Sequence, residues 1–287
     1  MTIPVIVSTG SLFNYDLDTV MKLAREVGFD GIELMIDWRR ETHHPAHLQA
    51  VVARYDLPIL AVHSPFVRMD LGTWPADPIA SIKQSVSLAE TVGARVVVIH
   101  PPRRWVRLQG LLTTPNRTRK ISVPLPLAGP GRLGHWLQHD LANFQATTEV
   151  KIALENMPCR RLGPLRLEPH HYTDPIILNR FPYLTLDTTH VGTRQIDLLH
   201  YFEQVKQRVI HIHLSNYNGA EHQLPTNGSL PLTPLLNRLL QGEFSGLVSL
   251  ELSPTSLQSE NETFVKQNLR ESLAFCRHTL GVEVRSR

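Results

Sequence analysis

The sequence predicts a closed (β/α)8 barrel, the TIM barrel, built as a single domain over residues 1–287. Three observations predict this fold. Short apolar runs alternate eight times with stretches of helical periodicity, no glycine-rich phosphate loop follows the first run, and several later runs end in a carboxylate. A chain of 287 residues with 42% hydrophobic residues is long enough for such a barrel, which typically needs about 250 residues.

The apolar runs give the expected strands, at residues 3–7, 31–36, 59–63, 95–100, 150–155, 183–187, 209–214 and 247–252. Apolar residues at helical spacing predict helices at residues 17–27, 46–55, 79–92, 136–147, 174–180, 196–207, 232–240 and 261–280. Asp16 or Asp18 suits the start of the first helix. Gly28, Gly93 and Gly246 stand at helix–strand junctions, where we expect each to end a helix in the left-handed conformation.

The alternation of side chains favours a closed barrel over an open doubly wound sheet. Three runs near the end of the chain read Ala153-Leu154-Glu155, Thr185-Leu186-Asp187 and Ser249-Leu250-Glu251. Successive side chains of a strand point to opposite faces. We therefore expect the leucines to pack outward on helices and the acids to point into the mouth of the barrel.

A long insertion, at about residues 102–134, interrupts the regular spacing after the fourth strand. It contains no acidic residue and seven basic ones, namely Arg103, Arg104, Arg107, Arg117, Arg119, Lys120 and Arg132. Its prolines and glycines between residues 123 and 131 exclude a regular helix. We interpret it as a βα loop over the active-site face, which either grips a phosphate of a sugar or of DNA or is simply solvated.

Composition excludes several classes of protein. The formal charge of +3 and the pI near 9.0 are too mild to indicate a nucleic-acid-binding protein on their own. Cys159 and Cys276 lie in no metal or redox spacing and fit free thiols in a reducing compartment. The N-terminus resembles no secretory signal, and no apolar run is long enough to span a bilayer. We expect a cytoplasmic protein without a membrane partner; the oligomeric state stays open, a homo-oligomer included.

Seven successive strands end in side chains that can bind a metal ion. In order these are Glu33, His63, His100, Glu155, Asp187, His213 and Glu251. Catalytic groups of such barrels lie at the C-terminal ends of the strands. Several ionised carboxylates in one mouth would repel one another, and a divalent cation resolves that conflict. Oxygen and imidazole ligands suit Mn²⁺, Mg²⁺, Co²⁺ or Zn²⁺.

At these strand ends the chain resembles the xylose-isomerase-like TIM-barrel superfamily, which includes sugar-phosphate isomerases and epimerases and endonuclease-IV-type AP endonucleases. The matching segments run in the family's order from the second strand to the eighth. They are Gly31-Ile32-Glu33-Leu34, His63-Ser64-Pro65, Val98-Ile99-His100-Pro101, Ala153-Leu154-Glu155-Asn156, Leu186-Asp187-Thr188-Thr189-His190, His211-Ile212-His213-Leu214 and Leu250-Glu251-Leu252.

The resemblance implies a role for each matching position. Glu155, Asp187, His213 and Glu251 would bind the metal ion, and His190 would contact the substrate or a further metal. His63 and His100 correspond to positions that hold an additional metal in the endonuclease branch. Two departures limit the transfer of either chemistry. Gly219 stands where the ketose epimerases have an arginine for the substrate, and Glu221-His222-Gln223 replaces the Asp-x-His of the endonucleases.

Several of these residues also have a purely structural interpretation. Glu33 either binds a substrate hydroxyl or braces the barrel, and His211 is expected to be a hydrogen-bonded interior histidine. His63 and His100 either hold a second metal or contact the substrate. His222 is a loop histidine, either exposed to solvent or a further candidate for the second metal or the substrate. The pairs His43-His44 and His170-His171 are expected to be surface histidines.

The leading hypothesis is a metal-dependent isomerase or epimerase of a small polyhydroxy carbonyl compound, such as a sugar or sugar phosphate, acting through an enediolate. Glu155 and Glu251 would remove and return the proton, and His190 would hold a substrate oxygen. The alternative is metal-dependent phosphodiester hydrolysis at abasic DNA sites, supported by His63, His100 and the basic insertion. A third hypothesis is a barrel that binds a ligand or metal without turnover.

Overall fold

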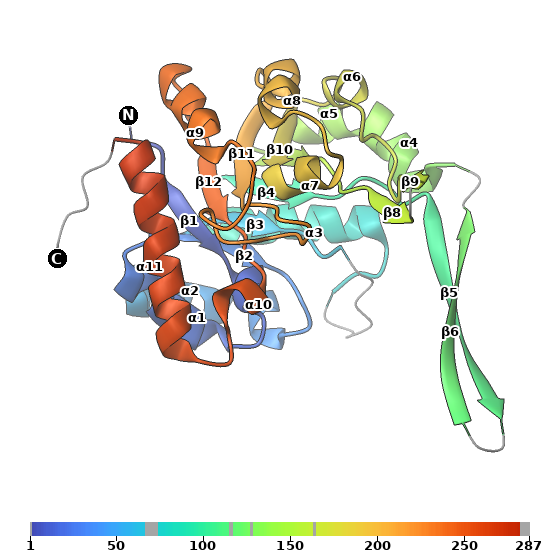
Figure 1. Cartoon of the computed structure of the whole chain (residues 1–287), viewed down its shortest axis with the longest axis horizontal. Helices are drawn as coiled ribbons and strands as arrows, with labels where there is room; N and C mark the ends of the chain where they lie inside the picture. Colours follow the sequence, from blue (N-terminus) through green and yellow to red (C-terminus); the bar gives the residue numbers. More distant parts are fainter. Residues whose placement is uncertain (1, 67–73, 115–116, 127–128, 163–164, 282–287) are drawn as a thin grey trace.

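The computed structural model describes residues 2–66, 74–114, 117–126, 129–162 and 165–281. Its centre is a closed barrel with the strand order β1-β12-β11-β10-β7-β4-β3-β2, all parallel (Figure 1). The barrel strands are β1 (Val5–Ser8), β2 (Ile32–Met35), β3 (Ile59–His63), β4 (Val96–Ile99), β7 (Lys151–Glu155), β10 (Tyr183–Asp187), β11 (Val209–Leu214) and β12 (Leu247–Leu250). The predicted (β/α)8 barrel is confirmed.

Helices surround the barrel (Figure 1). They are α1 (Leu17–Val27), α2 (Pro45–Tyr55), α3 (Pro78–Val92), α4 (Gly131–His139), α5 (Leu141–Gln145), α6 (Pro175–Leu178), α7 (Thr188–Thr193), α8 (Leu198–Val205), α9 (Leu232–Gln241), α10 (Pro254–Leu257) and α11 (Glu262–Thr279), with short 3₁₀ turns at Thr9–Leu12 and Arg40–His43. Within the described ranges, no helix is both long enough and apolar enough to cross a membrane.

The two faces of the strands pack as the alternation predicts. Leu154, Leu186 and Leu250 belong to the large core between the sheet and the helices. A smaller cluster fills the inside of the barrel and consists of Ile6, Ala61, Val96, Val98, Ala153 and Leu247. Burial of each leucine contributes roughly 1.5–3 kcal/mol. Because these leucines face the helices, the neighbouring residues of each strand face the inside of the barrel. The acids at the strand ends therefore point into the barrel mouth.

The helix ends agree in part with those predicted from the sequence. The Asp16 carboxylate accepts a hydrogen bond from the Thr19 backbone N–H, and Gly28 and Gly93 end their helices with φ of 99° and 76°. The single helix predicted over residues 136–147 is wrong, because α4 begins earlier, after Pro130, and Asp140 separates it from α5. The helix predicted over 196–207 is preceded by α7, which begins directly after β10.

The insertion was predicted to be a loop over the active-site face, and this prediction is wrong. It forms an antiparallel hairpin of β5 (Trp105–Thr114) and β6 (Arg117–Pro126) that extends away from the barrel (Figure 1). The connecting residues 115–116 and Leu127 and Ala128 lie outside the described residues. A second small hairpin, of β8 (Arg160–Leu162) and β9 (Leu165–Leu167), follows β7.

Gly246 serves close packing rather than a left-handed turn, which corrects the prediction. It is not among the glycines with positive φ, and a Cβ added there would lie 2.0 Å from the backbone oxygen of Ile210. We expect Gly246→Ala to destabilise the fold by about 1–3 kcal/mol, because the backbone of β11 must shift. Thermal melting measures this effect against Gly129→Ala, since an added Cβ at Gly129 meets nothing within 4 Å. Equal melting temperatures of the two variants would contradict the packing argument.

Candidate active site

Three acids and a histidine from four neighbouring strands meet at the mouth of the barrel. Glu155 and Asp187 are the last residues of β7 and β10, His213 lies in β11, and Glu251 directly follows β12. One ligand atom from each of these side chains lies within 4.8 Å of the others. The structure thus brings together the four residues for which the sequence predicts metal ligation.

The spacing of the ligand atoms suits a shared ion. His213 Nδ1 lies 2.9 Å from Glu251 Oε2, 3.4 Å from Glu155 Oε1 and 3.9 Å from Asp187 Oδ2. Two atoms that bind one ion at about 2.1 Å lie about 3.0–3.4 Å apart in octahedral or tetrahedral geometry. Small side-chain movements therefore suffice to place all four around one cation.

Three carboxylate oxygens at this point lack a hydrogen bond. They are Glu155 Oε2, Asp187 Oδ2 and Glu251 Oε2, all buried. Histidine nitrogens lie 2.9 Å from two of them, but without the alignment of a hydrogen bond. Within the described residues, no lysine or arginine forms an ion pair with any of the four side chains. Because unpaired buried charge is costly, this donor set fits a bound divalent cation.

Two further groups of potential ligands adjoin the first and share residues with it. One consists of His63, His100 and Glu155, and the other of Asp187, His190 and His222. Glu155 faces both sides, since its Oε2 lies 3.4 Å from His63 Nε2 and 2.9 Å from His100 Nε2, while its Oε1 faces His213 and His190. The predicted second-metal residues therefore lie beside the central group.

Three histidines of these groups place Nδ1 beside a backbone carbonyl oxygen. A backbone carbonyl can only accept, so the nitrogen beside it must carry the proton. The contacts are His63 Nδ1 to Ser64 O at 2.9 Å, His190 Nδ1 to Asn156 O at 2.8 Å and His222 Nδ1 to Glu251 O at 3.2 Å. Metal-binding histidines show this same arrangement, in which Nε2 of the neutral ring is available to bind the ion.

The acids and histidines shift one another's pKa values strongly. Burial acts to raise the pKa of Glu251, but His213 lowers it to about 2. Burial raises the pKa of Asp187 to about 6. Burial would lower the pKa of His190, yet Asp187 and Glu155 raise it to about 10, and Glu33 and Glu251 likewise hold the pKa of His213 well above its ordinary value. The group strongly attracts positive charge, which either protons or a metal ion can supply.

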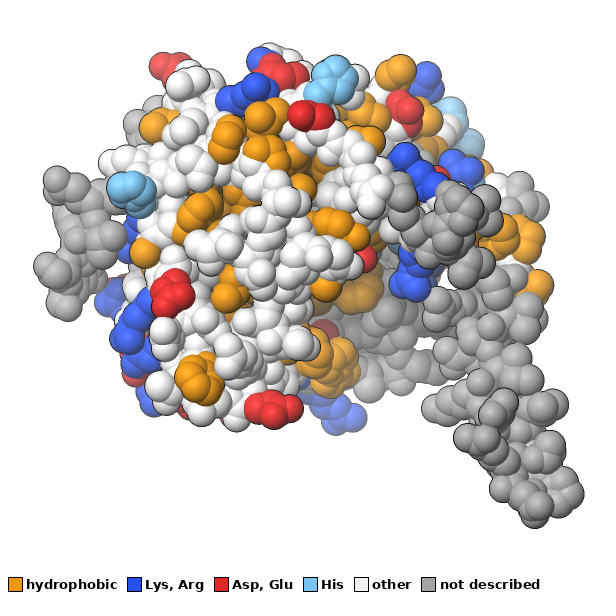
Figure 2. Space-filling model, in the orientation of Figure 1, with side chains coloured by type: hydrophobic (Ala, Val, Ile, Leu, Met, Phe, Trp, Pro, Cys, Tyr) orange, Lys and Arg blue, Asp and Glu red, His pale blue; other side chains and the backbone are white. Residues whose placement is uncertain are grey.

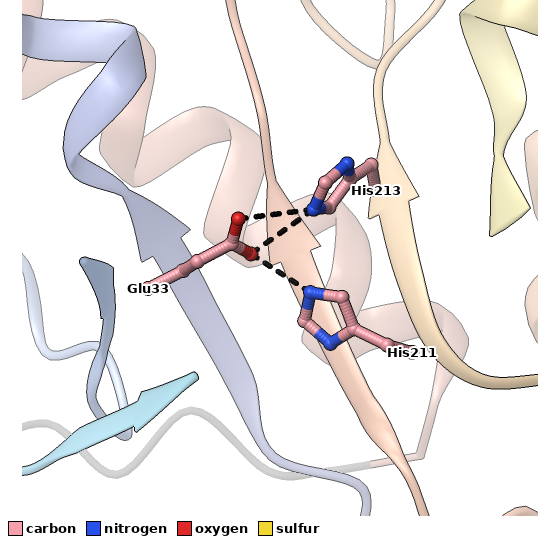
Figure 3. A group of neighbouring side chains, drawn as sticks. All are labelled: Glu33, His211 and His213. Carbon is pink, nitrogen blue, oxygen red and sulfur yellow. Dashed lines mark hydrogen bonds and ion pairs between the residues drawn. The ribbon is translucent and has the colours of Figure 1, made fainter. Parts of the chain in front are cut away.

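Glu33 lies beneath the four residues, with no exposure to solvent. Its carboxylate contacts His213 and His211, as Figure 3 shows. Burial acts to raise the pKa of Glu33, but these two histidines hold it well below the ordinary value. Contact with a substrate hydroxyl, one of the two roles expected for Glu33, does not fit the lack of exposure of its side chain. His211 is an interior hydrogen-bonded histidine.

His170 and Phe66 are site residues that sequence reasoning missed. His170 was expected on the surface, but it is buried, and its ring centroid lies 6.4 Å from that of His100. Burial, with His100 and Arg103, lowers its pKa to about 3. Phe66, just beyond β3, stacks on His100 at 5.3 Å and is 44% exposed. The sequence argument considered metal-binding residues at the ends of strands. It could not find His170 or Phe66, because both lie in connecting segments.

The other predicted surface pair is also corrected in part. His43 is buried, with its Nε2 2.5 Å from the Asp37 backbone oxygen and its ring beside Trp74, whereas His44 is exposed. The side chain of His222 is half-buried rather than exposed, and its loop is held by a hydrogen bond from the His222 backbone N–H to Thr189 Oγ1.

Part of the basic insertion contacts the protein itself. Arg103 donates to the Phe66 carbonyl, Arg104 donates to the His170 carbonyl, and Arg132 pairs with Asp77. On the face shown in Figure 2, the coloured basic and acidic side chains are interspersed.

Comparison with known proteins gives one family and a consistent fold. Residues 21–278 match the sequence model of the xylose isomerase-like TIM barrel family. An uncharacterized protein of Mycobacterium leprae (strain TN) is 29% identical over 298 residues, which cover 96% of this chain and 97% of that protein. The structure of 3-keto-D-glucoside 4-epimerase from E. coli superposes with a TM-score of 0.68 at 16% identity, covering 96% of this chain and 99% of that chain. A family 2 AP endonuclease from Brucella melitensis gives 0.58 at 14% identity, with coverages of 88% and 93%. At such identities the two structures show a shared fold.

Proposed function

The chain belongs to the xylose isomerase-like TIM barrel family, and we propose that it is a metal-dependent isomerase or epimerase of a small polyhydroxy carbonyl compound. The observation that supports this proposal most directly is the pair of carboxylates on either side of His213. Glu155 Oε1 and Glu251 Oε2 lie 3.4 Å and 2.9 Å from His213 Nδ1, and they come from β7 and from the end of β12. Two carboxylates that approach one point from different strands are suited to proton transfer on two sides of a substrate.

Glu155, Asp187, His213 and Glu251 would hold the cation, whose oxygen and imidazole ligands suit Mn²⁺, Co²⁺, Zn²⁺ or Mg²⁺. When bound, the ion supplies Lewis-acid polarisation of a substrate carbonyl, which acidifies the neighbouring carbon. The buried strands fix three of the four side chains, because Glu155, Asp187 and His213 are each no more than 1% exposed. The site therefore needs little rearrangement to bind the ion.

Glu251 is the better placed of the two acids to take a proton from the substrate. Its side chain is 15% exposed, whereas that of Glu155 is 1% exposed. Glu251 Oε2 would remove the proton, and Glu155 would return it to the other face or to the neighbouring carbon. His190, whose Nδ1 donates to the Asn156 carbonyl, would hold a substrate oxygen with Nε2. Phe66 offers an exposed apolar ring beside His100 for the carbon face of a sugar.

Glu251→Gln tests the proton transfer. We expect the variant to lose solvent deuterium incorporation by about 10²–10⁴-fold, since a positioned acid–base group contributes that much. The assay incubates metal-loaded protein in D₂O with a panel of ketoses and ketose phosphates and follows exchange by NMR. Glu260→Gln, an exposed glutamate between α10 and α11, is the matched control. Wild-type protein that exchanges no proton in the whole panel would contradict the isomerase proposal.

Metal-dependent phosphodiester hydrolysis is the second candidate. The two flanking groups favour it, because His63, His100, His190 and His222 could hold additional ions beside the central one. Two or more ions a few ångströms apart typically stabilise both the attacking and the leaving oxygen of a phosphoryl transfer. Metal stoichiometry separates the candidates, since one ion per chain favours the isomerase and three zinc ions favour the hydrolase. Incision of a DNA duplex with one abasic site tests the hydrolase directly.

A further inference from the structure

Two buried residues beneath the candidate metal centre take no part in the chemistry described so far. Glu33 comes from β2, and His211 lies two residues before His213 on β11. Figure 3 shows the Glu33 carboxylate facing both imidazole rings. It contacts Nε2 of His213, whereas Glu251 contacts Nδ1 of the same ring. All three side chains have no exposure to solvent. Neither a substrate nor bulk water can therefore be what Glu33 and His211 serve.

The contacts place a proton on Nε2 of His213. His213 Nε2 lies 3.0 Å and 3.1 Å from the two oxygens of Glu33, and His211 Nε2 lies 2.8 Å from Oε2. An ionised carboxylate only accepts hydrogen bonds. Both Nε2 atoms must therefore carry a hydrogen and donate to Glu33. In a neutral His213 ring, the lone pair then resides on Nδ1, which faces Glu155, Asp187 and Glu251.

We propose that Glu33 and His211 form a positioning pair that holds His213 in the Nε2–H tautomer and aims Nδ1 at the metal. This inference rests on the proposed metal site and adds two residues to it. Glu33 acts directly on His213, and His211 acts through Glu33 by donating to Oε2 from the opposite side. In the part of the chain that the structure describes, the other nitrogen of His211 has no hydrogen-bond partner, so Glu33 is the polar contact that its ring makes.

A purely structural brace is the competing explanation, and it predicts a different result. A brace would stabilise the barrel without changing how His213 presents its nitrogen. A positioning pair instead changes metal affinity and the electronic environment of the bound ion, because partners of ligating histidines orient the ring and raise its basicity. The two explanations therefore differ in metal binding and spectroscopy rather than in melting temperature.

Glu33→Gln is the first test, with Co²⁺ as the probe. Glutamine keeps the shape of the side chain but cannot accept from both rings with both of its terminal atoms. We expect the Kd for Co²⁺, measured by chelator competition, to rise about 10–100-fold, and the visible absorption of bound Co²⁺ to shift. Thr185→Val is the matched control, because Thr185 is buried beside His211 in the strand register and its hydroxyl makes no hydrogen bond. The control should bind Co²⁺ with unchanged affinity and spectrum.

A second variant tests the order of the contacts. His211→Asn should weaken Co²⁺ binding less than Glu33→Gln, since it removes only the outer contact. The double variant should bind no more weakly than Glu33→Gln alone, because His211 acts through Glu33. Additive losses in the double variant would overturn the assignment of His211.

A measurement on the unaltered protein does not depend on the variants folding. Long-range ¹H–¹⁵N NMR of the zinc-loaded protein, labelled at histidine nitrogens and assigned with His213→Gln, reports the tautomer of each ring. The expected result for His213 is a protonated Nε2. A protonated Nδ1, or equal Co²⁺ affinities of Glu33→Gln and the wild type, overturns the inference. Wild-type protein that binds neither Co²⁺ nor Zn²⁺ instead overturns the metal site itself.

Discussion

Replacing Glu155 with Gln is expected to lower turnover by about 10²–10⁴-fold and to reduce the number of bound metal ions. The two oxygens of Glu155 face different ligand groups, with Oε2 toward His63 and His100 and Oε1 toward His213. Glutamine replaces one oxygen by an amide nitrogen that cannot bind a cation. One change therefore removes both the proposed proton donor and a ligand shared by two groups.

Steady-state kinetics and elemental analysis of the same preparations measure the two effects. Glu271→Gln is the control, because Glu271 is an exposed residue of the C-terminal helix α11 and belongs to none of the ligand groups. It should keep the wild-type rate and metal content. If Glu155→Gln keeps the wild-type metal content and rate, Glu155 has neither role.

Removing the metal is expected to abolish activity and to lower the melting temperature. The buried acids at the mouth would lose the charge that holds them together, since three of their oxygens have no hydrogen bond from the protein. An ion present at 100 times its Kd adds about 2.7 kcal/mol of stability. For a chain of this size, that corresponds to a fall of roughly 5–10 °C after chelation.

Differential scanning calorimetry before and after dialysis against EDTA, followed by titration with Mn²⁺, Co²⁺, Zn²⁺ or Mg²⁺, measures this dependence. Recovery of both melting temperature and turnover with one of these ions supports the proposal. A chelated protein that melts unchanged and remains fully active would show that the acids are balanced without a metal.

Much of the barrel was predictable because its strands obey a simple rule. Leu154, Leu186 and Leu250 face the helices, and the residue after each is an acid that faces the mouth. A period of two in a buried strand leaves little freedom, because a shift by one residue would turn the leucines into the barrel interior and bury the acids against the helices. The same rule predicted that Glu155, Asp187 and Glu251 would meet at the mouth of the barrel.

The parts that were not predictable depend on packing between segments far apart in the chain. Glu33 carries the same signal as the other strand-end residues, and only the three-dimensional contacts with His211 and His213 distinguish it from a substrate-binding group. His170 lies in a connection after β9 and becomes buried because Arg103 and Arg104 pair with its backbone and that of Pro169. No local sequence pattern predicts a contact between segments so far apart in the chain.

The hairpin after β4 is a further example. Prolines excluded a helix there, but the ladder from Trp105–Pro126 to Thr114–Arg117 depends on a long series of cross-strand backbone bonds. Period-two patterns are weak signals in a sheet of only two strands, such as β5 and β6. The glycine at position 246 was misread for a similar reason, because its constraint is the nearby oxygen of Ile210 and not its own backbone angle.

Anomalous diffraction from crystals of zinc-loaded protein, collected on both sides of the zinc absorption edge, tests the central claim most directly. The account predicts a peak bounded by Glu155, Asp187, His213 Nδ1 and Glu251, at about 2.0–2.2 Å from each ligand atom. An empty centre among these four side chains, with zinc bound only elsewhere or not at all, would contradict it.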